Sequence, residues 1–511
     1  MSLTAAELEN VVTRDESNSP ALVPRRDLRR MLEGLEACEF RARRGAPLAK
    51  LCAAGADYGW GELERAAGSD LLGQTSVKAR ASLRRQLQKS LERITRPCFD
   101  LEWKSFELAM NSLGLAVSNA ALTEKMFLRD RPDYRLSLLF QKFPVLADLW
   151  CLRIRQWRYH VAEVLRRAAK DRRALSGWDI REPINGTIKD IRLGLSDPHH
   201  SGRSVTLIEF NECRRVIYKP RPGTSEAAWF SFLDWMNQSG FRPPQRIPRI
   251  LRRKGYCWME YVETAPCQNE AAVRRFYERL GGLIAAAYLM KAVDCHRQNV
   301  IAAGEHPVLV DIDALWHVSR LTKTQSPEDV LYRTGFLPNS KPRSLQSRSS
   351  VLGPATTGQH LPIIAGKPVF PAPFTGNIIA GFRRAWNCIV GTKNRRSEFL
   401  RHVRKVRTQR RRWIYRATEG YGATLQASLQ PAVLRSLAAR DQFIADSCLA
   451  RAPSRTVGKA EIGAIRQLDL PYFARRTNHA MPADESSAPS ELTEAIRRSV
   501  KPSQGSLLKK G

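Results

Sequence analysis

Acidic and amide residues surround a short apolar run at residues 293–317, VDCHRQNVIAAGEHPVLVDIDALWH. Asp294 and Asn299 are five positions apart, and Asp311 follows the run PVLV twelve positions later. Phosphoryl transfer needs one carboxylate that orients the nucleophile, and an amide oxygen and a second carboxylate that hold Mg²⁺ on the nucleotide phosphates. Protein kinases present these groups in the same order. The stretch therefore predicts a phosphoryl-transfer site in which Asp294 orients the nucleophile.

Two further parts of such a site precede this stretch. Lys219 ends the β-branched run RRVIYKP, where a cation on a strand could pair with phosphate. The segment GLSDPHHSGRSV (194–205) is rich in Gly, Ser and His but has no GxGxxG pattern; we expect it over the phosphates. Taken alone, each residue is typical of a cap, a turn or a surface charge, and a structural role suits His296 almost as well as a chemical one. Their common order favours phosphoryl transfer.

The elements that must position these residues follow from periodicity. Residues 26–180 carry apolar residues at helical spacing. The short β-branched runs at 203–210 and 214–220 favour a hairpin, and 255–263 is a further strand. Three more helices are predicted in SEAAWFSFLDWMNQSG, in AAVRRFYERLGGLIAAAYLMKAV, which leads into the acidic stretch, and in FTGNIIAGFRRAWNCIVGT. Residues 335–375 are rich in Pro, Gly and Ser and predict a long loop.

Composition narrows the class of protein. The 511 residues include 83 Lys and Arg against 50 Asp and Glu, a net charge of +33. This excess attracts anions: nucleic acid, membrane headgroups, nucleotide phosphates or an acidic peptide. The ten Cys form no CxxC pair and no Cys/His cluster, so we expect neither zinc nor a disulfide framework. With no secretory signal and no run of about 18 apolar residues, we expect a cytoplasmic protein that makes no membrane contact.

Six segments, in order along the chain, resemble the dehydratase domain of class II lanthipeptide synthetases, the LanM type. They are FPVLADLW (143–150), GLSDPHHSGRSV, VIYKPR (216–221), DCHRQNVIAAGEHPVLVDIDALWH, RRWIYRATEGY (411–421) and LDLPYF (468–473). The resemblance implies an α+β fold with a two-lobed core similar to lipid kinases and additional helices. It divides the chain into a helical N-terminal region (1–140), the dehydratase core (141–475) and a flexible tail (476–511).

The resemblance also implies a reaction. ATP- and Mg²⁺-dependent phosphorylation of Ser and Thr in a precursor peptide with an acidic leader would be followed by elimination of phosphate, which leaves dehydroalanine or dehydrobutyrine. The residues carried over by motif are Lys219, Asp294, His296, Asn299 and Asp311 for phosphorylation, with Asp313 as a further metal ligand, Asp197 and His199 near the phosphates, and Arg412 and Thr418 for elimination.

The sequence departs from the family pattern at two positions and in length. Asp313 stands where Glu is common, which shortens the reach of that carboxylate by one methylene, and Gln298 replaces another common Glu. The chain stops about 40 residues after LDLPYF and lacks a Cys/Cys/His site, so we expect a dehydratase without the cyclase domain, and a separate cyclase as a candidate partner. Two alternatives stay open: a kinase-like phosphotransferase that does not eliminate, and a non-enzymatic basic binding protein with a decayed kinase-like core. Nucleic acid is the less favoured partner.

Overall fold

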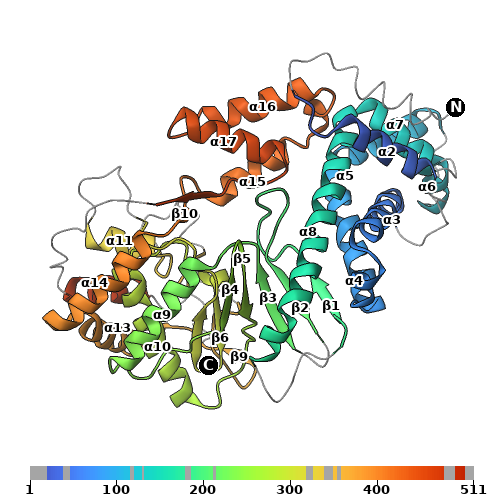
Figure 1. Cartoon of the computed structure of the whole chain (residues 1–511). Coiled ribbons are helices and arrows are strands. Elements are labelled where there is room, and N and C mark those ends of the chain that lie inside the picture. The colour runs from blue at the N-terminus through green and yellow to red at the C-terminus, as the bar shows by residue number, and fades with distance from the viewer. Residues whose placement is uncertain are drawn as a thin grey trace, which may run out of the picture. The chain divides into compact units, whose positions relative to one another are not determined.

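The computed structural model describes residues 20–37, 46–114, 120–128, 132–178, 186–210, 214–317, 326–338, 349–353, 358–476 and 489–500, and Figure 1 shows their elements. The chain forms two compact units. The first contains Met1–Pro220 and Tyr415–Tyr472, and the second Arg221–Ile414 and Phe473–Gly511. These units do not follow the predicted divisions at residues 140 and 475, which stay predictions.

The first unit begins with helices that pack around the long helix α8 (Pro144–Ser176). Trp150 of α8 is fully buried, and its indole nitrogen donates to Thr95 Oγ1 at 2.8 Å. Gly55 makes room for this indole, since a Cβ there would lie 2.5 Å from its ring. The helical spacing over 26–180 is confirmed in the described part of that range. The other helices are α2 (Arg25–Glu36), α3 (Pro47–Ala67), α4 (Ser69–Gly73), α5 (Val77–Ser112), α6 (Ala120–Leu128) and α7 (Pro132–Lys142).

Three strands of the same unit form an antiparallel meander: β1 (Asp190–Arg192), β2 (Thr206–Glu209) and β3 (Arg215–Lys219). Leu207 in the middle strand pairs with Arg192 on one side and with Ile217 on the other. The predicted hairpin over 203–220 is therefore confirmed, and Lys219 is the last residue of its second strand.

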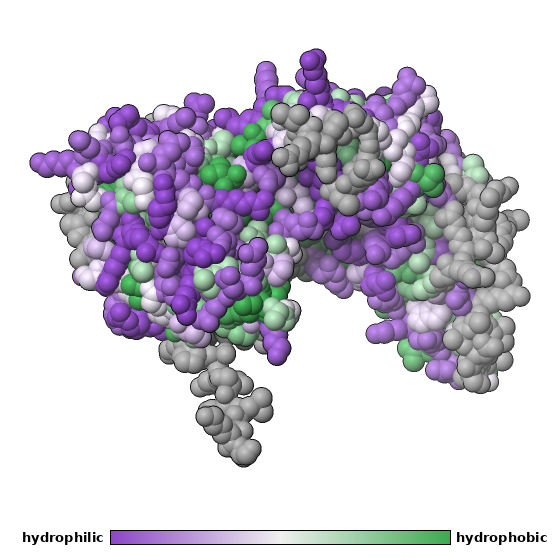
Figure 2. Space-filling view, turned by 90° about the horizontal axis from the view of Figure 1, so that it is seen from below, coloured by the Kyte–Doolittle hydropathy of each residue, from purple (hydrophilic) through white to green (hydrophobic). Residues whose placement is uncertain are grey.

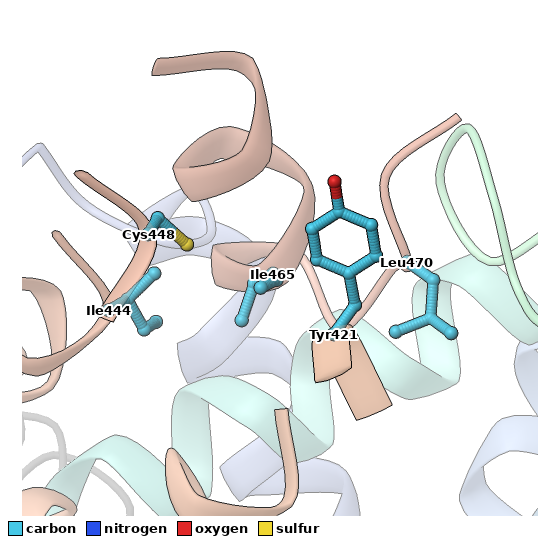
Figure 3. Close-up of a cluster of buried hydrophobic side chains, with 5 residues drawn as sticks. All are labelled: Tyr421, Ile444, Cys448, Ile465 and Leu470. Atoms are coloured by element: carbon cyan, nitrogen blue, oxygen red, sulfur yellow. The ribbon is translucent and has the colours of Figure 1, made fainter. Parts of the chain in front are cut away.

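The C-terminal part of the first unit is a group of short helices, α15 (Thr418–Ala427), η4 (Pro431–Val433), α16 (Leu437–Leu449) and α17 (Arg455–Arg466). Figure 3 shows their core, in which Ile465 lies between Ile444 and Cys448 of α16 on one side and Tyr421 and Leu470 on the other. Glu461 is fully buried and accepts hydrogen bonds from Arg416 and from the Tyr421 hydroxyl, which satisfies its charge. These contacts hold α15 and the residues before it against α17.

The second unit is built around two helices in close contact, α10 (Glu270–Leu289) and α13 (Thr375–Val390). A Cβ at Gly281 would lie 1.9 Å from the Ile378 carbonyl oxygen, and one at Gly381 would lie 1.8 Å from that of Glu278. Glycine at both positions therefore allows backbone to touch backbone. The remaining elements are α9 (Thr224–Gln238), β4 (Ile250–Arg253), β5 (Tyr256–Glu260), η2 (Arg297–Asn299), β6 (Val300–Ala303), β7 (His306–Leu309), α11 (Pro327–Arg333), β8 (Ile363–Ile364), β9 (Lys367–Pro368), η3 (Ala372–Phe374), α14 (Lys393–Arg407), β10 (Arg411–Trp413), β11 (Phe473–Arg475) and α18 (Pro489–Ser499).

Most of these elements match the periodicity, and two segments differ from it. The strand at 255–263 and the three predicted helices are confirmed as β5, α9, α10 and α13. The expectation of a flexible tail does not hold for 489–499, because Leu492, Ala495 and Ile496 are fully buried where α18 packs against α11 and α13. The segment 335–375, expected as a long loop, contains the short hairpin β8–β9 in its described part.

The surface is mainly hydrophilic on the face that Figure 2 displays, where hydrophobic residues gather only in small groups. Within the described ranges no helix is both long and apolar enough to cross a bilayer.

Candidate functional site

The stretch after α10 is a tight turn with unusual backbone geometry. Lys291 and Asp294 both have positive φ, 48° and 68°. Residues other than glycine seldom adopt this conformation, and those that do gather at functional sites. The side-chain nitrogen of Asn299 donates to the Asp294 carbonyl oxygen at 2.8 Å, which closes the five-residue spacing into a loop. Because this bond uses the amide nitrogen, the amide oxygen of Asn299 is the group that can face a cation.

A two-stranded hairpin then returns the chain to this loop, so that the segment beginning at Asp311 lies beside it. Val300 of β6 pairs with Leu309 of β7, and Gly304 makes the turn between the strands with φ of 62°. The Val310 amide donates to the Asn299 carbonyl at 2.8 Å. The expected glycine turn and short strand are therefore confirmed, and the chain reaches Asp311 directly beside the end of the first loop.

Arg221 binds the carboxylates that follow β7. Its Nη2 atom donates to Asp311 Oδ1 and also to Glu226 Oε1, the latter at 2.9 Å. Its Nη1 atom lies 3.6 Å from Asp313 Oδ2. One guanidinium thus contacts three carboxylates, of which that of Glu226 is almost fully buried. No role was predicted for Arg221 from the sequence, although it lies two positions after Lys219 in VIYKPR.

Arg412 approaches the same carboxylates from β10. Its Nη1 atom lies 3.5 Å from Asp294 Oδ2 and 3.8 Å from Asp313 Oδ1, and its backbone amide donates to the Asp313 carbonyl at 3.0 Å. On its other side the Asp294 carboxylate lies 3.5 Å from His296 Nε2. Burial raises the pKa of Asp313, while the guanidiniums of Arg221 and Arg412 act in the opposite direction. The second unit therefore brings together six residues predicted from the sequence: Asp294, His296, Asn299, Asp311, Asp313 and Arg412.

The oxygen donors of this group suit Mg²⁺, which prefers carboxylate, amide and phosphate oxygens. Asp313 Oδ2 is buried and makes no hydrogen bond among the described residues, so it is an oxygen that a cation would satisfy. In the described part of the chain no three His, Cys, Asp or Glu side chains gather closely enough to hold a metal. A Mg²⁺ ion here would therefore need the Asn299 amide oxygen and the phosphate oxygens of its nucleotide besides the two carboxylates Asp311 and Asp313.

In the first unit, the segment LDLPYF holds the loop that contains SDPHH. The Asp469 carboxylate accepts hydrogen bonds from the backbone amides of Ser201 and Gly202 at 2.5 and 2.8 Å. His199 Nδ1 lies 2.7 Å from the Leu470 carbonyl oxygen. His200, Ser201 and Gly202 all have positive φ, and successive amides in such turns form a concave nest that binds anions. The anion in this nest is the chain's own Asp469, so these amides are already occupied.

Of the other predicted residues of the first unit, Lys219 and Thr418 lie at the ends of a strand and a helix, and Asp197 lies in a loop. Lys219 at the end of β3 is almost fully buried, as expected only of a lysine with an anionic partner. Thr418 is the first residue of α15 and is partly exposed. Asp197 lies at the start of the loop held by Asp469 and is exposed. The roles assigned to these three residues and to His199 stay predictions.

Comparisons with known proteins cover the segments that contain both groups of residues. A family model described as a domain of unknown function, DUF4135, matches residues 143–357 and 347–476. The lacticin 481/lactococcin biosynthesis protein LcnDR2 of Lactococcus lactis subsp. lactis is 25% identical over 381 residues, which cover 65% of this chain and 40% of that protein. The chain thus spans less than half the length of this curated relative. On the extent of the family match, the chain belongs to the DUF4135 family.

Proposed function

We propose that this chain dehydrates Ser and Thr residues of a ribosomally made lanthipeptide precursor, by phosphorylating their hydroxyl groups and then eliminating phosphate. The name of its relative, a lacticin biosynthesis protein, supports a role in this class of peptide. The observation that carries the proposal is the 3.5 Å contact between Arg412, assigned to elimination, and Asp294, assigned to phosphoryl transfer. A lipid-kinase-like core is part of this proposal.

In the first half-reaction Asp294 would orient the Ser or Thr hydroxyl and accept its proton as the hydroxyl oxygen forms a bond to the γ-phosphorus of ATP, while the bond from that phosphorus to the β,γ-bridging oxygen breaks and ADP leaves. Bound Mg²⁺-ATP would supply the phosphoryl group and neutralise its charge. Asn299, Asp311 and Asp313 would hold the cation through oxygen atoms. Because Arg221 binds both of these carboxylates, it keeps them close together and limits their mutual repulsion before the cation binds.

In the second half-reaction the Asp294 carboxylate, after it has released its first proton to solvent, would take the α-proton of the phosphorylated residue. The C–H electron pair then forms the Cα=Cβ bond as the Cβ–O bond breaks and phosphate departs. A guanidinium stabilises a leaving phosphate dianion through paired, charge-assisted hydrogen bonds. Arg412 lies beside Asp294, where the phosphorylated side chain would be formed. Its guanidinium can bind the phosphate once it has released the carboxylates of Asp294 and Asp313. The Thr418 hydroxyl would donate to the phosphate or relay a proton.

The proposal is tested by incubating the purified chain with ATP, Mg²⁺ and a short Ser-, Thr- and Cys-rich peptide encoded beside its gene. A product that has lost the mass of water supports dehydration. A product that stops at the phosphorylated peptide supports the phosphotransferase alternative. An unmodified peptide, together with a salt-dependent gel shift on nucleic acid, supports the alternative of a basic binding protein.

A further inference from the structure

The segment 313–317 connects the two halves of the proposed site. On one side it binds the chain before Asp294: the Val293 amide donates to the Ala314 carbonyl at 3.0 Å, and the His317 amide donates to the Lys291 carbonyl at 2.9 Å. These are backbone bonds, so the loop that carries Asp294 is held without any side chain of the segment. Changes to a side chain in 313–317 should therefore leave that loop in place.

On its other side the same segment binds β10. The Arg412 amide donates to the Asp313 carbonyl at 3.0 Å, and Arg411 Nη2 donates to the Trp316 carbonyl at 3.4 Å. Besides these two bonds and the Arg412–Asp313 ion pair, the side chain of His317 makes contact with β10. Its ring stacks on that of Trp413, with centroids 4.2 Å apart and an interplanar angle of 21°. Its Nε2 atom lies 3.1 Å from the backbone nitrogen and 3.2 Å from the carbonyl oxygen of Ile414, the residue after β10.

Both ring nitrogens of His317 have hydrogen-bond partners. Nδ1 lies 3.2 Å from Arg333 Nη2, and a guanidinium nitrogen can only donate, so Nδ1 accepts in this contact. Nε2 faces the carbonyl oxygen of Ile414, to which it can donate, and the amide of Ile414, from which it can accept. Burial, supported by the nearby charge of Arg333, lowers the pKa of His317 to about 4. The ring is thus neutral near pH 7, as this arrangement requires.

We propose that His317 is a positioning residue that holds β10 in the register which places the Arg412 guanidinium against Asp294, and that it serves elimination more than phosphorylation. This inference rests on the proposed function. Stacking of the imidazole on Trp413 sets the distance between β10 and the 313–317 segment. The contact with Ile414 fixes the position of β10 along that segment. Without the imidazole, Arg412 would keep its charge, but its guanidinium would no longer be held against Asp294. A displacement of about 1 Å can reduce a rate by about a hundredfold.

Three variants separate this role from general stability. His317→Phe keeps a ring over Trp413 and removes both nitrogen contacts. His317→Gln keeps an amide nitrogen that can donate to the Ile414 carbonyl. The matched control is His360→Phe, because His360 is also buried in the second unit, and among the described residues it makes no hydrogen bond or ring contact with β10.

Two rates and one structural readout are measured for each variant. They are phosphorylation of an unmodified peptide, elimination from a peptide phosphorylated beforehand, and hydrogen exchange of fragments that contain 411–414. For His317→Phe we expect elimination to fall about tenfold or more relative to phosphorylation, with faster exchange in 411–414. His317→Gln should restore part of the elimination rate and part of the protection of 411–414 from exchange. His360→Phe should change neither the ratio of elimination to phosphorylation nor the exchange of 411–414.

Equal losses in the two rates, or unchanged exchange of 411–414 in His317→Phe, would overturn the positioning role. If the wild-type chain catalyses neither half-reaction, the proposed function is wrong. The exchange measurement then decides by itself whether His317 holds β10, so the two failures can be told apart.

Discussion

Arg412 and Asp294 are 118 positions apart in the chain, and a guanidinium nitrogen of the first lies 3.5 Å from a carboxylate oxygen of the second. The contact exists because the segment 313–317 binds the chain before Asp294 on one side and β10 on the other. The residue assigned to elimination thus lies next to the residue assigned to phosphoryl transfer. If both roles are right, one site performs both half-reactions, and mutations should separate them.

Loss of the carboxylates should stop phosphate transfer without unfolding the chain. Asp294→Asn removes the group that accepts the hydroxyl proton, and Asp311→Asn removes a charged metal ligand. Each should slow phosphorylation by about 10² to 10⁴. The readout is the mass of the peptide after incubation with ATP and Mg²⁺. Asp441→Asn is a matched control, because Asp441 forms an ion pair with Arg466 outside the site. A normal rate in either site variant would remove that residue from the mechanism.

The outer face of α14 should contribute to binding of an acidic leader peptide. Lys393, Arg396, Arg404 and Lys405 have no carboxylate of the described residues within ion-pair range, and β10 follows this helix directly. Changing Arg396, Arg404 and Lys405 to Glu should weaken leader affinity about tenfold at low salt, and the difference should shrink as ionic strength rises.

The control for this charge reversal is the same change at Lys78, Arg85 and Lys89, which are exposed on α5. Fluorescence anisotropy of a labelled leader measures both affinities over a salt series. If the control lowers affinity as much as the α14 variant, the attraction comes from net charge and not from this face. An affinity that does not depend on salt would leave the basic excess without a role in leader binding.

The contribution of His160 to stability should fall as pH falls from about 7 to about 4. Burial lowers the pKa of His160 to about 4, and its Nε2 atom lies 3.1 Å from Thr206 Oγ1. The unfolded chain takes up a proton near pH 6.5 whereas the folded chain does not, so the stabilisation by this residue is present above the unfolded pKa and is lost towards pH 4. The loss from His160 is at most about 3 kcal/mol. The pKa values of His306, His317 and His360 are also lowered to about 4, so they act in the same direction.

Urea unfolding of His160→Gln at pH 7 and at pH 5 tests this assignment. The variant should lose less stability between the two pH values than the wild type does. Val161→Ala removes buried volume at the next position without a titratable group, and should lower stability equally at both pH values. An unchanged pH dependence in His160→Gln would show that this histidine is not a source of acid sensitivity.

Local sequence patterns predicted the elements around the site well. The hairpin that ends at Lys219 and the helices α9, α10 and α13 follow from spacing of apolar residues over short distances. Asp294, Asn299 and Asp311 also lie close together in space, because a short hairpin with a glycine turn brings the chain back to the loop of Asp294 and Asn299. Such features depend on neighbours in sequence, so a single sequence contains them.

The contacts that complete the site could not be predicted in this way. Asp469 binds the amide of Gly202 from 267 positions away, and Arg221 binds Asp311 from 90 positions away. No local pattern specifies which distant guanidinium or backbone amide a carboxylate will bind. In the sequence alone, Asp469 and Arg221 look like any other charged residues. Helix α18 was missed for a related reason: its apolar residues are few and lie in a polar stretch, and they gain their stability from burial against α11 and α13.

The most direct test of the account is the fate of the peptide when Arg412 is changed. Arg412→Ala, Arg412→Lys and Thr418→Ala are incubated with unmodified peptide, ATP and Mg²⁺, and the product masses are followed over time. Arg410→Ala serves as control, since Arg410 is exposed and reaches only towards the Ala474 carbonyl in the described contacts. We expect the control to give dehydrated peptide and the Arg412 and Thr418 variants to accumulate peptide that has gained phosphate, because phosphorylation persists while elimination stalls. Fully dehydrated peptide from Arg412→Ala, or peptide left unmodified, would contradict the account.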